Sequence, residues 1–110
     1  MTDQQTYFML LKTTATWLAL KPDSRFEYLE SIIQPILKKH AAVTLQYFDS
    51  EFFSARITDI AMWQTDDQKA WAHLVEDLRC ELFWGTYFEI VELIPAIKNA
   101  YSSNYQRPAI

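Results

Sequence analysis

The sequence predicts an α+β fold of the ferredoxin-like type, a βαββαβ chain with one antiparallel sheet, two helices on one face and a short C-terminal helix. Three observations support this prediction. Apolar runs follow one another in the order strand, helix, strand, strand, helix, strand. Two segments have the pattern of a helix capping box, and the loop between the middle strands is short enough for a hairpin.

The first strand is predicted from Tyr7 to Lys12, because a bulky apolar run without a helix breaker is typical of a central strand buried on both faces. Thr13 or Thr14 can then cap a short turn, which carries Trp17, Leu18 and Leu20.

The first long helix is expected to begin at a capping box formed by Ser24 and Glu27. Apolar residues and one histidine follow at helical spacing: Phe26, Leu29, Ile33, Ile36, Leu37 and His40. Pro35 lies inside this pattern and removes a backbone donor, so we expect the helix to kink or divide near Gln34.

The second half of the chain repeats the strand and helix pattern. Val43–Asp49 and Ala55–Trp63 alternate like strands, and Thr65 to Gln68 resembles a second capping box. The helix after it has a buried stripe of Trp71, Leu74, Val75, Leu78 and Leu82.

Gly85, the only glycine, is placed in the turn before the last strand, Tyr87–Ile94. Pro95 is expected to end that strand and to start a final helix. One side of this helix would carry Ile97, Ala100, Tyr101 and Tyr105. The tail from Gln106 to Ile110 is expected to fray, within a single domain that spans residues 1–110.

The expected sheet order is 4-1-3-2, with the first and third strands in the centre. If the hairpin is symmetric about Phe52, one face of the middle strands shows Val43, Leu45, Tyr47, Ile57, Asp59, Ala61 and Trp63. This more apolar set is predicted to face the helices, although a slip of one residue would exchange the two faces.

The opposite face of the sheet also carries large apolar residues, since either face of the first strand holds at least two of them. Contiguous apolar surface usually marks an interface. A long loop could cover it instead, but the chain has none to spare. We therefore expect a homodimer in which two sheets pack face to face.

Composition excludes several classes of function. The formal net charge of −4 disfavours nucleic acids and anionic membranes as partners, since both are bound by basic surfaces. One cysteine permits neither an internal disulfide nor a cysteine-rich metal site. Residues 1–6 are polar, unlike a signal peptide, and no run is long enough to span a membrane, so a cytoplasmic location is expected.

Residues that commonly carry chemistry are sparse. His40 is expected at a helix C-terminus and His73 in solvent, with no metal-ligand spacing around either, so no metal, haem or other cofactor is predicted. Cys80 is expected to be half-buried and unreactive. The strand around Arg56 lacks the glycine and exposed aromatic pair of an RNA-binding module.

The better site candidates are charged residues in a predicted central strand, where an unpaired charge is costly. Asp59, near Tyr47 and Trp63, could be a general base with a raised pKa in an apolar pocket. Alternatively, it accepts hydrogen bonds from Tyr or Trp, or lies in solvent.

Arg56 could bind an anionic ligand, or lie in the dimer contact paired with an acidic residue such as Glu89 or Glu92. Tyr28 and Tyr87 could add hydroxyl groups to a pocket, or serve as amphipathic residues at its boundary.

The whole chain resembles the darcynin family of small bacterial proteins. The similar stretches are Phe8–Lys12, Trp17–Leu20, Pro35–Leu37, Tyr47–Asp49, Phe53–Arg56, Trp63–Asp67, Tyr87–Val91 and Ile94–Ile97. The resemblance implies a compact α+β protein of the dimeric α/β-barrel type. It transfers no catalytic residue, because no activity is established for the family.

Two functions remain open from the sequence. One is a homodimeric binding or interaction module without a catalytic motif, with a small apolar or aromatic molecule as a possible ligand. The other is a cofactor-independent oxygenase or isomerase acting on a small aromatic or quinone-like molecule, with Asp59 as its base.

Overall fold

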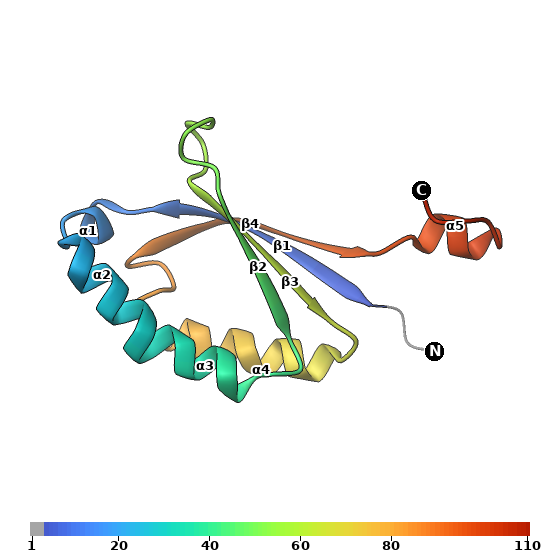
Figure 1. Cartoon of the computed structure of the whole chain (residues 1–110), viewed down its shortest axis with the longest axis horizontal. Helices are drawn as coiled ribbons and strands as arrows, with labels where there is room; N and C mark the ends of the chain where they lie inside the picture. The colour runs from blue at the N-terminus through green and yellow to red at the C-terminus, as the bar shows by residue number, and fades with distance from the viewer. Residues whose placement is uncertain (1–3) are drawn as a thin grey trace.

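The computed structural model describes residues 4–110 and shows a four-stranded antiparallel sheet with helices along one face (Figure 1). The strands are β1 (Gln5–Thr13), β2 (Thr44–Asp49), β3 (Asp59–Thr65) and β4 (Phe88–Ile97). The helices are α1 (Ala15–Leu18), α2 (Pro22–Tyr28), the π-helix η1 (Leu29–Ile33), α3 (Gln34–Lys39), α4 (Gln68–Arg79) and α5 (Ala100–Asn104). Of the polar start of the chain, residues 1–3 lie outside the described part.

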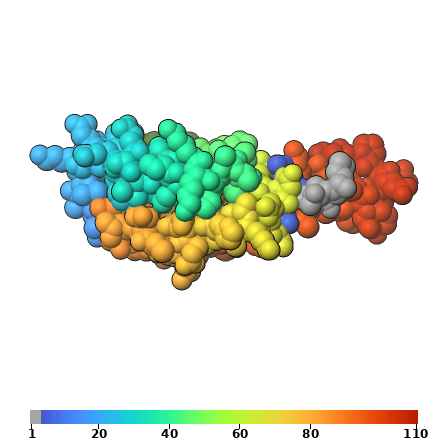
Figure 2. Space-filling model, turned by 90° about the horizontal axis from the view of Figure 1, so that it is seen from below, coloured from blue at the N-terminus to red at the C-terminus, as the bar shows by residue number. Residues whose placement is uncertain are grey.

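The sheet order β2-β3-β1-β4 confirms the predicted topology, with β1 and β3 in the centre. Viewed from the helix side, α2 to α3 lie beside α4 over the sheet, and α5 lies apart from both (Figure 2). None of the helices in residues 4–110 is long and apolar enough to cross a membrane.

The core lies between the helices and one face of the sheet. Tyr7, Met9 and Leu11 of β1 point into it, and Tyr7 stacks on Trp71 of α4 with 4.1 Å between ring centroids. The other buried members of this core are Trp17, Val43, Ala61, Trp63, Leu74, Leu78, Phe83 and Phe88. Most conspicuous aromatic residues therefore serve packing.

The first long helix is divided, as Pro35 predicts. The chain passes from α2 through the wide turns of η1 into α3, and Pro35 occupies the first turn of α3. Proline has no N–H to give to the preceding turn, so the α-helical hydrogen-bond pattern is interrupted there.

The predicted capping boxes are wrong in detail. The N-cap of α2 is Lys21, which makes no side-chain cap bond and is followed by Pro22, so Ser24 already lies inside the helix. In α4 the cap is Asp67, whose carboxylate accepts from the backbone N–H groups of Lys69 and Ala70. A carboxylate next to the first turn satisfies these donors more directly than the Thr65 hydroxyl could.

Thr14 does cap α1, as expected, and accepts from the backbone N–H of Trp17.

The strand β3 begins at Asp59 rather than at Ala55. The Ser54 hydroxyl accepts from the backbone N–H groups of Arg56 and Ile57, which holds this stretch in a turn. The hairpin is consequently centred on Ser54 and not on Phe52, with Asp49 opposite Asp59. The centre moves by two residues, which leaves each side chain on its predicted face of the sheet. The residues predicted to face the helices therefore do so.

The strand β4 continues through Pro95 to Ile97, so the prediction that Pro95 ends it is wrong. Because β4 is an edge strand, a residue without an N–H is tolerated there. The last helix, α5, begins only after Asn99, which has a left-handed backbone with φ of 55°.

No helix within residues 4–110 covers the second face of the sheet. Phe8, Leu10, Ile60 and Met62 are half-buried on it, and Phe48 and Ile94 are exposed at its margins. We call these six residues the open face.

Candidate functional site

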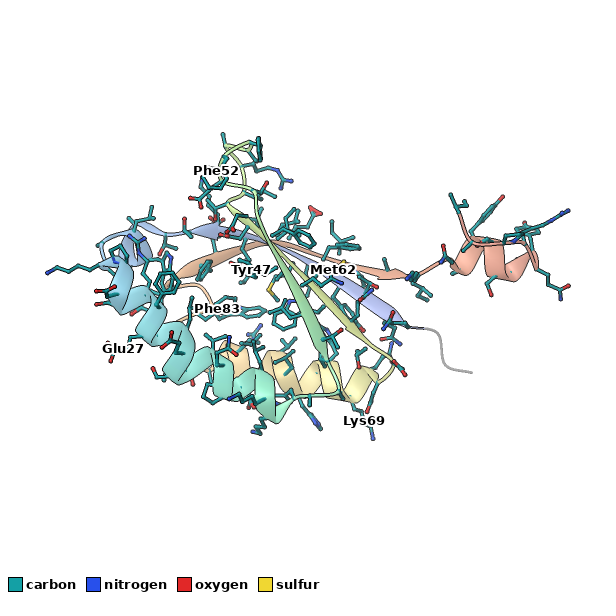
Figure 3. The ribbon with its side chains drawn as sticks, in the orientation of Figure 1. Glu27, Tyr47, Phe52, Met62, Lys69 and Phe83 are labelled. Atoms are coloured by element: carbon teal, nitrogen blue, oxygen red, sulfur yellow. The ribbon has the colours of Figure 1, made fainter. Side chains whose placement is uncertain are left out.

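A cavity of about 400 Å³ lies between the divided helix and the covered face of β2 and β3. Its helix side is formed by Phe26, Leu29, Ile33, Gln34 and Leu37, and its sheet side by Leu45, Tyr47, Ala61 and Trp63. Figure 3 shows Phe83 between the helical layer and the sheet, with Tyr47 on β2 above it. The walls are thus mainly aliphatic and aromatic.

The polar groups of the cavity gather where β2 ends and β3 begins. Asp49, Glu51 and Asp59 all line it there. Asp49 and Asp59 are opposite each other in the strand ladder, which brings two carboxyl groups together at one end of an apolar space. Asp49 and Glu51 are exposed, so this end of the cavity reaches the surface.

Asp59 is the buried member of this group, with only 6% of its surface exposed. Burial raises the pKa of its carboxyl group, a hydrogen bond from Thr58 lowers it, and a hydrogen bond to the Asp49 carboxyl group raises it again. The Thr58 hydroxyl donates to Asp59 Oδ2 at 2.6 Å. The net direction is upward, so Asp59 takes up a proton more readily than an exposed aspartate does.

Tyr47 adds a phenol beside these acids. The residue is 46% exposed. Burial of its hydroxyl group, followed by the negative charge of Asp59, raises the pKa of the phenol well above its usual value. Tyr47 therefore keeps its proton at neutral pH, and its hydroxyl can serve as a hydrogen-bond donor.

Trp63 has a polar atom that the protein leaves unused. Its indole ring lines the cavity and is 3% exposed, and its Nε1–H has no hydrogen-bond partner among residues 4–110. Buried donors are nearly always paired, so an unpaired one on a residue that lines a cavity is unusual.

Arg25 is the basic residue of the cavity lining. Its Nε donates to the backbone oxygen of Trp17 at 3.2 Å, and its Nη2 donates to that of Leu18 at 3.0 Å. The guanidinium thus fastens α2 to the end of α1, and much of its donor capacity is used there.

Of the residues singled out in the sequence, the structure brings Asp59, Tyr47 and Trp63 together in the cavity. Tyr28 lies beside it, where its hydroxyl accepts from the backbone N–H of Phe83 at 2.9 Å and so has a structural role. Glu89 is exposed near the start of β4.

Arg56 is exposed in the β2–β3 loop, so the prediction that it lies in a central strand is wrong. Neither Arg56 nor Glu89 forms an ion pair within residues 4–110.

Sequence reasoning missed Asp49, Glu51 and the helix residues of the lining. Only the correct hairpin register places Asp49 opposite Asp59, and that register depends on the turn at Ser54.

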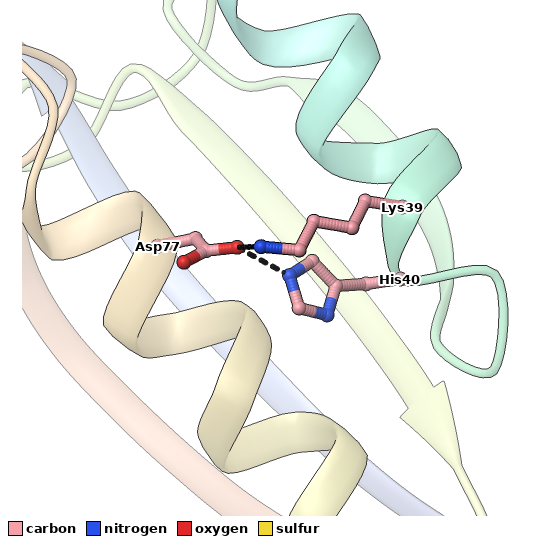
Figure 4. A network of polar contacts seen from close by, with 3 residues as sticks. All are labelled: Lys39, His40 and Asp77. Atoms are coloured by element: carbon pink, nitrogen blue, oxygen red, sulfur yellow. Dashed lines mark hydrogen bonds and ion pairs between the residues drawn. The ribbon is translucent and has the colours of Figure 1, made fainter.

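The other polar cluster lies outside the cavity, where α3 ends (Figure 4). His40 Nε2 and Lys39 Nζ contact Asp77 Oδ2 of α4 at 2.6 and 2.9 Å. The bond to His40 and then that to Lys39 lower the pKa of Asp77. This cluster joins the two helices, and His40 acts as a helix C-cap.

His73 is exposed, as expected, whereas Cys80 is exposed rather than half-buried because it lies just past the end of α4. Within residues 4–110 no three His, Cys, Asp or Glu side chains are grouped so that they could hold a metal ion.

Solved structures resemble this fold at low sequence identity. A mutant chlorite dismutase from Candidatus Nitrospira defluvii superposes with a TM-score of 0.76 and 8% identity, over 98% of this chain and 45% of that one. The same enzyme in complex with imidazole gives 0.74 and 10%, over 94% and 44%. The chain thus spans less than half the length of these structures, and the similarity shows the ferredoxin-like α+β fold alone.

Relatives identified by sequence have a much higher identity to this chain than those structures do. A darcynin homolog of Granulibacter bethesdensis is 53% identical over 106 residues, which cover 96% of this chain and 86% of the relative. One from Streptomyces avermitilis is 38% identical over 101 residues, or 91% and 84% of the two chains. Residues 2–110 match the family described as Darcynin, domain of unknown function. The resemblance seen in the sequence is confirmed, and the chain belongs to the darcynin family.

Proposed function

We propose that this protein binds a small, largely apolar molecule in the cavity between the divided helix and the sheet. The observation that carries the proposal is the cavity itself, about 400 Å³ with apolar walls and polar groups at one end. Small-molecule sites have volumes of roughly 300 to 1,000 Å³ and this same distribution of groups. The buried aromatic rings of the lining, those of Trp17, Trp63, Phe83 and Phe88, favour a flat or aromatic ligand.

The construction of the cavity wall supports binding rather than incidental loose packing. Leu29, Ile33 and Leu37 reach the cavity from the segment around the π-helix, where the regular helix is interrupted. Wide π-turns are frequent at functional sites because they alter which side chains face a neighbouring element. The unpaired Nε1–H of Trp63 adds a donor for a ligand atom.

The test is to block the cavity. Ile33→Trp would fill it with a larger side chain from the helix wall, while Glu30→Trp places the same residue on the exposed side of η1 as a control. The probe is the neutral dye N-phenylnaphthylamine, measured by fluorescence titration. We expect one dye per chain, with affinity reduced about tenfold or more in Ile33→Trp and unchanged in Glu30→Trp. Equal binding by Ile33→Trp and the wild type would contradict the proposal.

A cofactor-independent enzyme is the second candidate, and the raised pKa of Asp59 inside the cavity favours it. A carboxyl group whose pKa is shifted toward neutrality can take a proton from a bound substrate. In this case Asp59→Asn would abolish turnover of a small aromatic or quinone-like substrate while the dye still binds. Turnover that survives in Asp59→Asn would exclude Asp59 as the base.

We also propose that the protein is a cytoplasmic homodimer whose two sheets meet through the open face. The support is the extent of apolar surface there, with Phe48 48% and Ile94 40% exposed. A groove at one end of this face, lined by Phe8, Met62 and Ile97 among others, would receive side chains of a second copy.

A further inference from the structure

We propose that the ligand of the cavity is an amphiphilic amine, with its ammonium group bound between Asp49 and Asp59 and its apolar body against the helix wall. The inference rests on the proposed function and names the chemical class of the molecule that the cavity takes.

The charges in the cavity favour a cation. Its lining contains three acidic residues, Asp49, Glu51 and Asp59, and one basic residue, Arg25. Arg25 donates to the backbone oxygens of Trp17 and Leu18 and forms no ion pair with these acids within residues 4–110, so the acids outnumber the base and are not paired with it. An anionic ligand would meet repulsion at this end, whereas an ammonium group would meet charge-assisted hydrogen bonds.

The arrangement of these charges favours an amphiphile rather than a free metal ion or a small cation. All three acids lie at the end of β2, in the loop after it, or at the start of β3, while the rest of the lining is mostly apolar. A molecule that satisfies both parts has a cationic head and a body without charge.

The raised pKa of Asp59 provides a specific signature of binding. Asp59 is 6% exposed and lies beside Asp49, Glu51 and the Tyr47 phenol, with Thr58 donating to it and Arg25 as the basic residue of the lining. Burial and the neighbouring acids raise the pKa of its carboxyl group. An ammonium group stabilises the carboxylate and lowers this pKa, so its binding should release protons at a pH where Asp59 is partly protonated.

The Nε1–H of Trp63 is a second and independent sign of a ligand. Trp63 lines the cavity, and its buried Nε1–H has no partner in residues 4–110. A ligand with a hydroxyl or ether oxygen on its apolar body would supply the missing acceptor.

The experiment compares three probes that share one skeleton and differ in the terminal group: tyramine, tyrosol and hydroxyphenylacetate. Isothermal titration calorimetry of the full chain at neutral pH gives their affinities. We expect tyramine to bind about tenfold more tightly than tyrosol, and hydroxyphenylacetate to bind most weakly. Titration of tyramine in buffers of different ionisation enthalpy should show proton release.

Asp59→Asn keeps the size of the side chain and removes its charge, so the preference for tyramine over tyrosol and the proton release should both disappear. Asp49→Asn changes the exposed member of the pair and should lower the affinity for tyramine but not for the other two probes. Asp66→Asn, which changes an exposed carboxylate outside the cavity lining, is the matched control and should behave as the wild type.

The results distinguish a failure of this inference from a failure of the proposed function. If tyrosol binds as tightly as tyramine and Ile33→Trp weakens both, the cavity binds ligands but the preference for a cation is wrong. If none of the three probes binds and the neutral dye also fails, the proposed function is wrong as well.

Discussion

At the scale of single residues, Asp59 shows how a fold can place an acid where water is scarce. It begins β3 on the face that packs against the helices, and its neighbour across the ladder is a second aspartate. A buried carboxyl group next to another acid is unfavourable for folding, since its ionised form loses hydration and meets repulsion. A fold that keeps such a carboxyl group is less stable than it would be without it, and the group lies where a ligand would contact it.

The pH dependence of stability should reveal this. The folded-state pKa of Asp59 is raised above that of the unfolded chain, which is about 4. As pH rises through this interval the unfolded chain loses the proton first, so the folded form is progressively disfavoured. We expect Asp59→Asn to match the wild type at about pH 3 and to have the higher free energy of unfolding at neutral pH.

Urea denaturation at several pH values measures this difference, with Asp66→Asn as the control for loss of an exposed charge. If the wild type gained stability relative to Asp59→Asn as pH rose, Asp59 would have a favourable partner and its pKa would not be raised.

The predictions for single residues are correct where they depend only on the alternation of side chains along a strand. Asp59, Tyr47 and Trp63 were placed on the helix-facing side from strand alternation, which a shift of the hairpin centre by two residues leaves unchanged. Asp49 was missed because its position opposite Asp59 depends on the exact register. Register follows from turn geometry, here the hydrogen bonds of Ser54, which no periodicity reveals.

At the scale of secondary-structure elements, α4 depends on a specific residue for its first turn. Asp67 accepts from the backbone N–H of Lys69 at 2.9 Å and from that of Ala70 at 3.4 Å. Replacement of Asp67 by Ala should lower the free energy of unfolding by about 1 kcal/mol, because these donors lose their partner.

The neighbouring Asp66→Ala is a close control, since Asp66 is exposed and caps nothing in the described part of the chain. Chemical denaturation of the two variants should separate them. A loss of stability in Asp66→Ala equal to that in Asp67→Ala would indicate a general effect of helix-dipole charge instead of a specific cap.

Element types were predictable, but several element boundaries were not. Pro35 correctly indicated a divided helix, because a missing N–H interrupts any helix regardless of its surroundings. Pro95 was misleading, since its effect depends on whether its strand lies at the edge of the sheet. That is a property of the assembled sheet, and a local sequence pattern does not contain it.

At the scale of the whole molecule, the helices of the described part of the chain cover one face of the sheet and leave the other open. Order, topology and the exposed second face follow from the sequence because two long helices cannot cover both faces of four strands. A pocket at Asp59 was predicted, but its volume could not be, since that depends on how far the divided helix stands from β2 and β3. Such a distance results from packing of many side chains together.

The oligomeric state tests the role of the open face. We expect light scattering at micromolar concentration to give about twice the monomer mass of 13.0 kDa. Met62→Lys places a charge in the centre of the open face and should give the monomer, because an unpaired charge in such a contact is costly. Glu30→Lys changes the exposed helical side and should remain dimeric. A monomer mass for the wild type would contradict the proposed dimer.

The π-helix η1 has a further consequence for how this chain tolerates insertions and deletions. A π-turn holds one more residue than an α-turn, and removing one residue turns the rest of a helix by about 100°. Deletion of one residue between Leu29 and Ile33 should therefore convert the π-turn into an α-turn and leave Leu37 facing the cavity, whereas the same deletion within α4 would rotate the rest of that helix. The wide turn absorbs the extra residue, so a change of one residue in length is tolerated in this segment and not in a regular helix.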